Sequence, residues 1–370
     1  MYRLRIISGH LAPSGSSNYT RDLSRTDCGS AGSRSPDDVV VVHGRRTAIG
    51  KAKRGSFKDT TPDELLSAVM TAVLADVGLS PDKLGDVCVG NVLQPGAGAV
   101  MARVAHFLSV ESMTLRSTDK PGDLSSRLTD HDKARDCLIP MGEKQDAFAL
   151  SSHQKAARAQ SSGLFDHEIL PVTTRFVDDE GKEHEVTVRK DDGIRPGTTL
   201  AGLGKLRPAF KPYGSSTAGN SSQVSDGAAA VLVGRRSVVE ALGLPVLGVL
   251  RASAVVGVPP EVMGIGPAVA IPVALEQAGL TVADIDVFEI NEAFASQAVY
   301  CVEKLGIPEE KVNPNGGAIA LGHPLGCTGA RQVVTLLHEL RRRGRRAFGV
   351  VSMCIGTGMG AAAVFEYPGP

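Results

Sequence analysis

The chain has 370 residues, of which 42% are hydrophobic and 22% are charged, and its formal net charge is zero. This balance is typical of a globular protein that buries a sizeable core in two or three packed units, without the basic excess that nucleic-acid-binding proteins use for phosphate contacts. No uninterrupted apolar run approaches the roughly eighteen residues needed to cross a bilayer. We therefore expect neither a nucleic-acid partner nor a membrane span.

The six cysteines are widely spaced and form no Cys-x-x-Cys pair. This spacing argues against a disulfide framework and against a zinc site, so we expect a reducing compartment and no metal. A cysteine of this kind is usually a small buried apolar residue. The six are Cys28, Cys88, Cys137, Cys301, Cys327 and Cys354.

Residues 1–37 have the composition of a targeting leader, because they are rich in Ser and Arg and contain no acidic residue before Asp22. One interpretation is a mitochondrial presequence, and the other is an address that a receptor reads. Four residues that would share one face of a helix resemble the amino-terminal peroxisomal signal, which favours the peroxisome and its import receptor over the mitochondrion. These residues are Arg3, Leu4, His10 and Leu11.

The folded part begins at residues 38–44, an unbroken β-branched run that predicts a buried strand. Thr61 then caps a helix that starts at Pro62 and ends at Gly78. Residues 86–91, Asp-Val-Cys-Val-Gly-Asn, predict the following strand, with Cys88 inside it.

The same order recurs farther along the chain, where a helix runs from Gly266 to Gly279 and residues 286–291 predict a strand. Residues 77–80, Val-Gly-Leu-Ser, match residues 278–281, Ala-Gly-Leu-Thr. A duplicated α/β unit explains this repeat, so we expect two halves, each with a mostly parallel sheet covered by helices. A site would then lie at strand ends between the halves.

A more polar stretch with possible strands at 172–175 and 185–188 separates the two halves. We interpret it as an inserted loop subdomain, and the alternative is a solvated excursion without function. The predicted units are an incomplete amino-terminal half at 38–110, the insertion at 111–214, a return to the first half at 215–243, and the carboxyl-terminal half at 244–370.

Three segments of the second half could carry chemistry. Asn291-Glu292-Ala293-Phe294 follows a buried strand and opens a helix, and Glu292 there could be either a base or a capping acid. The Gly- and Pro-rich loop at 313–326 holds His323, either for proton transfer or to brace the loop.

The third segment follows the strand at 348–353. Cys354 begins the sequence Cys-Ile-Gly-Thr-Gly-Met-Gly, in which the glycines would let a substrate carbonyl reach backbone N–H donors that stabilise its charge. We expect Cys354 to be presented at the turn, with its thiolate favoured by those N–H groups and by a nearby imidazolium. A free cysteine without function is the alternative.

In this order and spacing, Asn-Glu-Ala-Phe, Gly-Gly-Ala-Ile-Ala-Leu-Gly-His-Pro and Cys-Ile-Gly-Thr-Gly-Met-Gly resemble the three carboxyl-half signatures of the thiolase family. The leader and the Ser-Met-Cys-Ile-Gly context are most similar to its peroxisomal, fatty-acid-degrading members. The resemblance implies an α/β fold of duplicated halves, layered α-β-α-β-α, with an inserted loop subdomain. It also implies a homodimer.

The resemblance further implies cleavage of a 3-ketoacyl-CoA by coenzyme A, a co-substrate, with no permanently bound cofactor. Cys354 would be the acid and base of the reaction, and His323 would activate the nucleophile. Asn291 would position the water of one oxyanion hole, and the N–H of Gly356 would serve the second. Positions expected to line the CoA groove are Met141, Arg195, Ser222, Met263 and Phe294.

The family's nucleophilic cysteine should lie in an Asn-Arg-x-Cys-x-Ser-Gly-type motif between residues 101–103 and 111–113, where this chain offers only residues 104–110. We interpret the gap, and a shorter one after residue 142, as skipped exons or a faulty gene model. Without an acyl acceptor, we expect little or no thiolysis. The alternative is a silent protein that binds CoA or pairs with full-length subunits, while a decarboxylating condensing enzyme is disfavoured because that family carries His at the position of Cys354.

Overall fold

The computed structural model of the chain describes residues 34–92, 110–112 and 142–370. The amino-terminal leader, Cys28, Cys137 and Met141 lie outside these ranges. The described elements before residue 243 are β1 (Val39–Thr47), β2 (Gly50–Lys51), α2 (Pro62–Val77), β3 (Val110–Ser112), α5 (Gly142–Ser161), β4 (Ile169–Leu170), β5 (Val172–Val177), β6 (Glu183–Val188), α6 (Leu200–Leu203), β7 (Ser225–Arg235) and α7 (Arg236–Ala241).

The second half begins at β8 and ends three residues before the carboxyl terminus. Its strands and helices are β8 (Gly248–Gly257), α8 (Gly266–Ala278), β9 (Val287–Ile290), α9 (Ala295–Leu305), α10 (Ala318–Leu321), α11 (Thr328–Arg342), β10 (Ala347–Ile355) and β11 (Met359–Tyr367). Within the ranges described, no helix is both long and apolar enough to span a membrane.

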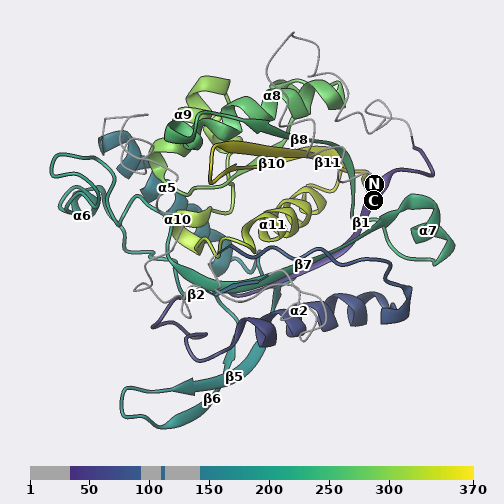
Figure 1. Cartoon of the computed structure of the whole chain (residues 1–370), viewed down its shortest axis with the longest axis horizontal. Helices are drawn as coiled ribbons and strands as arrows, with labels where there is room; N and C mark the ends of the chain where they lie inside the picture. The colour runs from purple at the N-terminus through teal and green to yellow at the C-terminus, as the bar shows by residue number, and fades with distance from the viewer. Residues whose placement is uncertain (1–33, 93–109, 113–141) are drawn as a thin grey trace, which may run out of the picture.

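The strands of the two halves form one mixed sheet, in the order β2-β7-β1-β8-β11-β10-β9, with β3 beside β7 and β4 beside β1. The expectation of a mostly parallel sheet in each half is wrong, because among the described strands of this sheet only β4 with β1 and β9 with β10 pair in parallel, and the other neighbours are antiparallel. β1 joins the halves, because its first residues, Val39–Val41, pair antiparallel with β7 and also with Leu250–Gly248 of β8. Only the β5–β6 hairpin forms a separate sheet within the described residues, and it projects from the body (Figure 1).

Five layers are visible in Figure 1. α8 and α9 cover one face of the β8, β10 and β11 strands, α11 lies between the two parts of the sheet, and α2 covers the outer face of β1 and β7. α11 is almost entirely buried, since Leu336, Leu337 and Leu340 have no exposed surface. The predicted α-β-α-β-α layering is thus confirmed.

The two predicted repeat helices have matching ends. α2 begins after Thr61, whose N–H donates to the Glu64 carboxylate at 2.8 Å, and it ends at Gly78 in the left-handed conformation, with a φ of 65°. α8 ends at Gly279 in the same conformation, with a φ of 67°. Glycine adopts this conformation without steric cost, which is why it ends both helices.

The strand predicted at residues 86–91 is wrong, because the structure has no regular element there and leaves Cys88 exposed. In the carboxyl half, the corresponding β9 pairs parallel with Gly349–Ser352 of β10. The counterpart of β10 in the first half is β3, since Ser112 pairs with the second residue of β7 as Cys354 pairs with the second residue of β11.

Candidate functional site

Asn291 and His323 come together where β9 ends, although α9 and α10 lie between them in the sequence. The Asn291 side-chain nitrogen Nδ2 lies 3.2 Å from Nε2 of His323, and Nδ1 of His323 lies 2.6 Å from the hydroxyl of Thr328. The backbone N–H of His323 donates to the hydroxyl of Ser225 at 2.8 Å and to the carbonyl of Gln223 at 3.2 Å. These contacts fix the ring from both sides.

The contacts also fix the protonation state of His323. An amide nitrogen can only donate, so Nε2 of His323 must accept from Asn291, and the ring proton then lies on Nδ1 and is donated to Thr328. Burial, together with the positive charge of Arg331, lowers the pKa of His323 to about 4. The ring is therefore a neutral base at Nε2, and the expected imidazolium beside Cys354 is wrong for the resting protein.

Cys354 is the eighth residue of β10 and is half-buried. Its thiol donates to Oε1 of Gln297 at 3.0 Å, and burial raises its pKa to about 11. The prediction that the surroundings favour a thiolate is therefore wrong, because a half-buried strand position removes water from the sulfur without supplying a cation. Gly356 is exposed in the turn that follows.

Glu292 braces the loop that carries His323. Its buried carboxylate accepts from the Ser152 hydroxyl at 2.7 Å, from Nδ2 of Asn313 at 2.7 Å and from the N–H of Ile319 at 3.1 Å, at the start of α10. Gly317 leaves the necessary space, because a Cβ there would clash with the carboxylate of Glu292. Of the two interpretations of Glu292, the structure supports a capping acid, although the helix that it caps is α10 and not α9.

The residues expected to line a CoA groove are partly gathered around this site. Ser222 donates its N–H to the carbonyl of Ala293 at 3.0 Å, and the ring of Phe294 packs edge-on against Phe210 with centroids 5.9 Å apart. Both residues therefore lie next to Asn291 and Glu292 in the chain or in space.

The remaining positions expected in the CoA groove are Arg195, Met263 and Met141. Arg195 is exposed, and its backbone N–H donates to Nδ1 of His153 at 3.3 Å. Met263 is half-buried in a short 3₁₀ turn, Pro260–Ile265, that contacts α9 and β10. Met141 lies outside the described residues.

Sequence reasoning missed two residues that contact the site directly, Gln297 and Thr328. Gln297 lies on α9 and contacts Cys354, and Thr328 begins α11 and contacts His323. A single glutamine or threonine on an amphipathic helix gives no signal, because the same residues are common on helix surfaces. The contact of Gln297 with Cys354 arises only when α9 and β10 are placed together.

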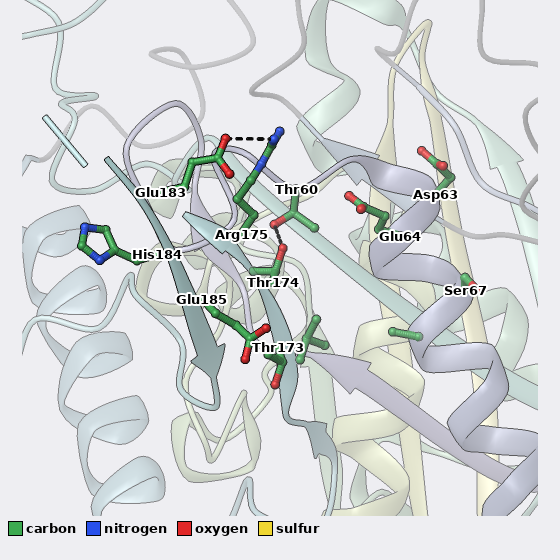
Figure 2. Close-up of a pocket in the computed structure, with 12 residues that line it drawn as sticks. Thr60, Asp63, Glu64, Ser67, Thr173, Thr174, Arg175, Glu183, His184 and Glu185 are labelled. Carbon is green, nitrogen blue, oxygen red and sulfur yellow. Dashed lines mark hydrogen bonds and ion pairs between the residues drawn. The ribbon is translucent and has the colours of Figure 1, made fainter. Parts of the chain in front are cut away.

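A polar groove lies elsewhere, between α2 and the β5–β6 hairpin (Figure 2). Arg175 and Glu183 face each other across the hairpin at 3.3 Å, and the hydroxyls of Thr60 and Thr174 lie 2.8 Å apart. None of the predicted site residues lines this groove. It is lined by Thr60, Asp63, Glu64, Ser67, Ala68, Val172, Thr173, Thr174, Arg175, Glu183, His184 and Glu185.

Two family descriptions match the chain. "Thiolase, C-terminal domain" matches residues 244–367, and "Thiolase, N-terminal domain" matches residues 39–109 and 142–237. Among solved structures, the dimeric peroxisomal thiolase of Saccharomyces cerevisiae is 43% identical with a TM-score of 0.76, covering 91% of this chain and 99% of that one. A human mitochondrial 3-ketoacyl-CoA thiolase in complex with CoA is 33% identical with a TM-score of 0.80, covering 90% of this chain and 98% of that one.

Curated relatives match over their whole length. The peroxisomal 3-ketoacyl-CoA thiolase B of Rattus norvegicus is 63% identical over 426 residues, with 100% of both chains covered. The peroxisomal 3-ketoacyl-CoA thiolase of Homo sapiens is 61% identical over 424 residues, again with 100% of both chains covered. These relatives confirm the peroxisomal location that the leader suggested. Signatures, layered fold and matches over both halves agree: the chain belongs to the thiolase family.

Proposed function

We propose that the site of this chain is built for acyl transfer from a 3-ketoacyl-CoA to CoA, with release of acetyl-CoA. The observation that carries the proposal is the neutral His323, whose Nε2 faces the Asn291 amide at 3.2 Å beside the strand that presents Cys354. A base, a proton-bearing thiol and amide groups at strand ends are the groups that thioester chemistry requires. The relatives named above carry this substrate in their names.

In this proposal His323 takes the proton of the nucleophile at Nε2. Cys354, protonated at rest, supplies a proton to the leaving carbanion and later removes one from the CoA thiol. Oδ1 of Asn291 is buried and makes no hydrogen bond among the described residues. It can therefore accept from a water molecule that stabilises one oxyanion, while the N–H of the exposed Gly356 serves the other.

We further propose that CoA lies over Arg195, Ser222, Met263 and Phe294, with Met141 contributing from outside the described residues. The half-buried Phe294 and Met263 offer apolar surface, and the exposed Arg195 offers a positive charge for a phosphate. A related human enzyme has been solved with CoA, and the related yeast enzyme is dimeric. We propose the same ligand and a homodimer for this chain.

The second candidate function is a silent thiolase that binds CoA or pairs with full-length subunits. It is favoured by the alignment with the rat relative, which spans 426 positions against the 370 residues of this chain and so leaves at least 56 without a counterpart. The amino-terminal family match is also interrupted between residues 109 and 142. We propose that the nucleophilic cysteine was lost here, because no cysteine of the chain lies in an Asn-Arg-x-Cys-x-Ser-Gly-type motif.

Thiolysis of a 3-ketoacyl-CoA by the purified chain separates the two candidates, with Cys354→Ala as the control. Turnover that disappears in Cys354→Ala would support the active enzyme and require another acyl acceptor. A folded protein that binds CoA in a calorimeter without turnover would support the silent thiolase. Absence of both turnover and CoA binding would contradict both candidates.

We also propose that the import receptor reads Arg3, Leu4, His10 and Leu11 of the leader. Fusing residues 1–37 to a fluorescent protein tests this assignment in cells. Peroxisomal fluorescence that is lost on replacing Arg3 and Leu4 would support it, whereas mitochondrial fluorescence would contradict it.

A further inference from the structure

Gln297 connects the two strand ends of the candidate site. It is a fully buried residue of α9, only 1% exposed, and its side chain lies between Asn291 and Cys354. Its Nε2 donates to the backbone carbonyl of Asn291 at 2.9 Å, and its Oε1 accepts from the thiol of Cys354 at 3.0 Å. One amide thus contacts both the residue that holds His323 and the proposed acid.

The orientation of this amide is determined by its neighbours. A backbone carbonyl can only accept a hydrogen bond, so the Asn291 carbonyl must face the NH₂ group of Gln297. The carbonyl oxygen of the Gln297 side chain then has to face the sulfur of Cys354. An oxygen in this position accepts a hydrogen bond from a thiol but repels a thiolate.

We propose that Gln297 is the positioning residue that keeps Cys354 protonated at rest and directs its S–H bond. The inference rests on the proposed acid and base role of Cys354. It explains why the neutral His323 and the neutral Cys354 coexist at one site: each is held in the form from which its first proton transfer starts.

The proposal also gives the second proton transfer a direction. When Cys354 protonates the carbanion, its S–H bond breaks and the electron pair stays on sulfur, facing the Gln297 oxygen. The repulsion between this oxygen and the thiolate favours removal of a proton from the incoming CoA thiol, which restores the S–H bond. Gln297 therefore makes the thiol the form to which each cycle returns.

The pH dependence of Cys354 alkylation tests this proposal without requiring turnover. Iodoacetamide reacts with the thiolate, and mass spectrometry of the peptide that contains Cys354 separates its rate from those of the other cysteines, from about pH 7 to about pH 10. Gln297→Leu removes the acceptor, and Gln297→Glu keeps an oxygen there and adds a negative charge. The matched control is Gln332→Leu, because Gln332 is also fully buried and donates to a β9 carbonyl, that of Glu289, at 2.8 Å.

We expect Gln297→Leu to move the alkylation profile to lower pH by about one unit, which makes alkylation about tenfold faster below the midpoint. Gln297→Glu should move it to higher pH, and Gln332→Leu should leave it in place. A purely structural role for Gln297 would not give opposite shifts for Leu and Glu. An unchanged or raised profile in Gln297→Leu, or an equal shift in Gln332→Leu, would overturn the proposal.

Circular dichroism and the unfolding midpoint identify any variant that fails to fold. If Gln297→Leu fails to fold, Gln297→Glu alone tests the proposal, because Glu has nearly the same shape as Gln. Alkylation of Cys354 must then be slower in Gln297→Glu. Failure of thiolysis with the expected alkylation shifts would reject only the proposed function. Normal thiolysis without those shifts would reject only the role of Gln297.

Discussion

Arg46 lies at the centre of a buried ionic cluster, and replacing it by Met should be strongly destabilising. Its side chain is fully buried, its Nε donates to Glu168 at 2.7 Å, and Nη1 and Nη2 donate to the two oxygens of Asp191 at 2.8 and 3.0 Å. The guanidinium also lies over the ring of Phe165, 5.1 Å from its centroid. The cluster therefore ties β1 to two separate parts of the predicted insertion.

Met keeps an unbranched apolar stem like that of Arg but ends before the guanidinium, so the substitution removes the charge and leaves two buried carboxylates without their cation. Removing one partner of a buried ion pair costs about 3–5 kcal/mol, because the remaining charge stays desolvated. The hydroxyl of Thr335 still donates to Glu168 at 3.2 Å and the N–H of Ile49 to Asp191 at 2.8 Å, which compensates only in part. We expect Arg46→Met to reduce the free energy of unfolding by about that amount.

Urea unfolding followed by circular dichroism measures the loss, with Arg175→Met as the matched control. Arg175 pairs with Glu183 at 3.3 Å, but both side chains are more than half exposed, so that pair should contribute less than about 1 kcal/mol. A loss in Arg46→Met no larger than in Arg175→Met would refute the reasoning that burial makes this pair strong.

Three further predictions concern the site and its surroundings. Gly317→Ala should displace the carboxylate of Glu292 and lower the free energy of unfolding in urea by about 1–3 kcal/mol. Gly85→Ala should lower it less, because a Cβ at Gly85 meets open space, and equal losses in the two variants would contradict the packing argument. Burial raises the pKa of Glu289 to about 8, so the folded state binds this proton more tightly than the unfolded state does. The free energy of unfolding should therefore fall between about pH 5 and pH 8, and it should fall less in Glu289→Gln. Parallel curves for the two proteins would contradict the raised pKa. The ring of His323 should stay neutral in NMR titrations down to about pH 4, and a midpoint near 6.5 would contradict the argument that burial and Arg331 lower its pKa.

Local sequence signals correctly predicted the helices and strands whose formation depends on residues adjacent in the sequence. The ends of α2 and α8 follow from Thr61, Gly78 and Gly279, and the strands β5 and β6, although not their pairing, follow from two short β-branched runs. Residues 86–91 have the same local signals as β9, yet only β9 is a strand. A local pattern does not contain the tertiary contacts that hold β9 against β10.

In the candidate site, too, sequence motifs identify the residues, whereas tertiary packing determines their chemical states. The motifs identified Asn291, His323 and Cys354, and the structure places Asn291 against His323. Their protonation states could not be predicted, because burial raises the pKa of Cys354 to about 11 and lowers that of His323 to about 4, and burial depends on tertiary packing. The role of Glu292 depended in the same way on Ser152, which is far from it in the sequence.

The pairing of β1 with β8 has a consequence for how the molecule opens. Val39–Val41 pair with strands of both halves, so we expect amide hydrogens along this seam to exchange slowly with solvent. The halves should therefore melt as one cooperative unit. β8 and β11 connect this seam to β10, so we expect a destabilising change in the amino half to increase the mobility of the strand that holds Cys354.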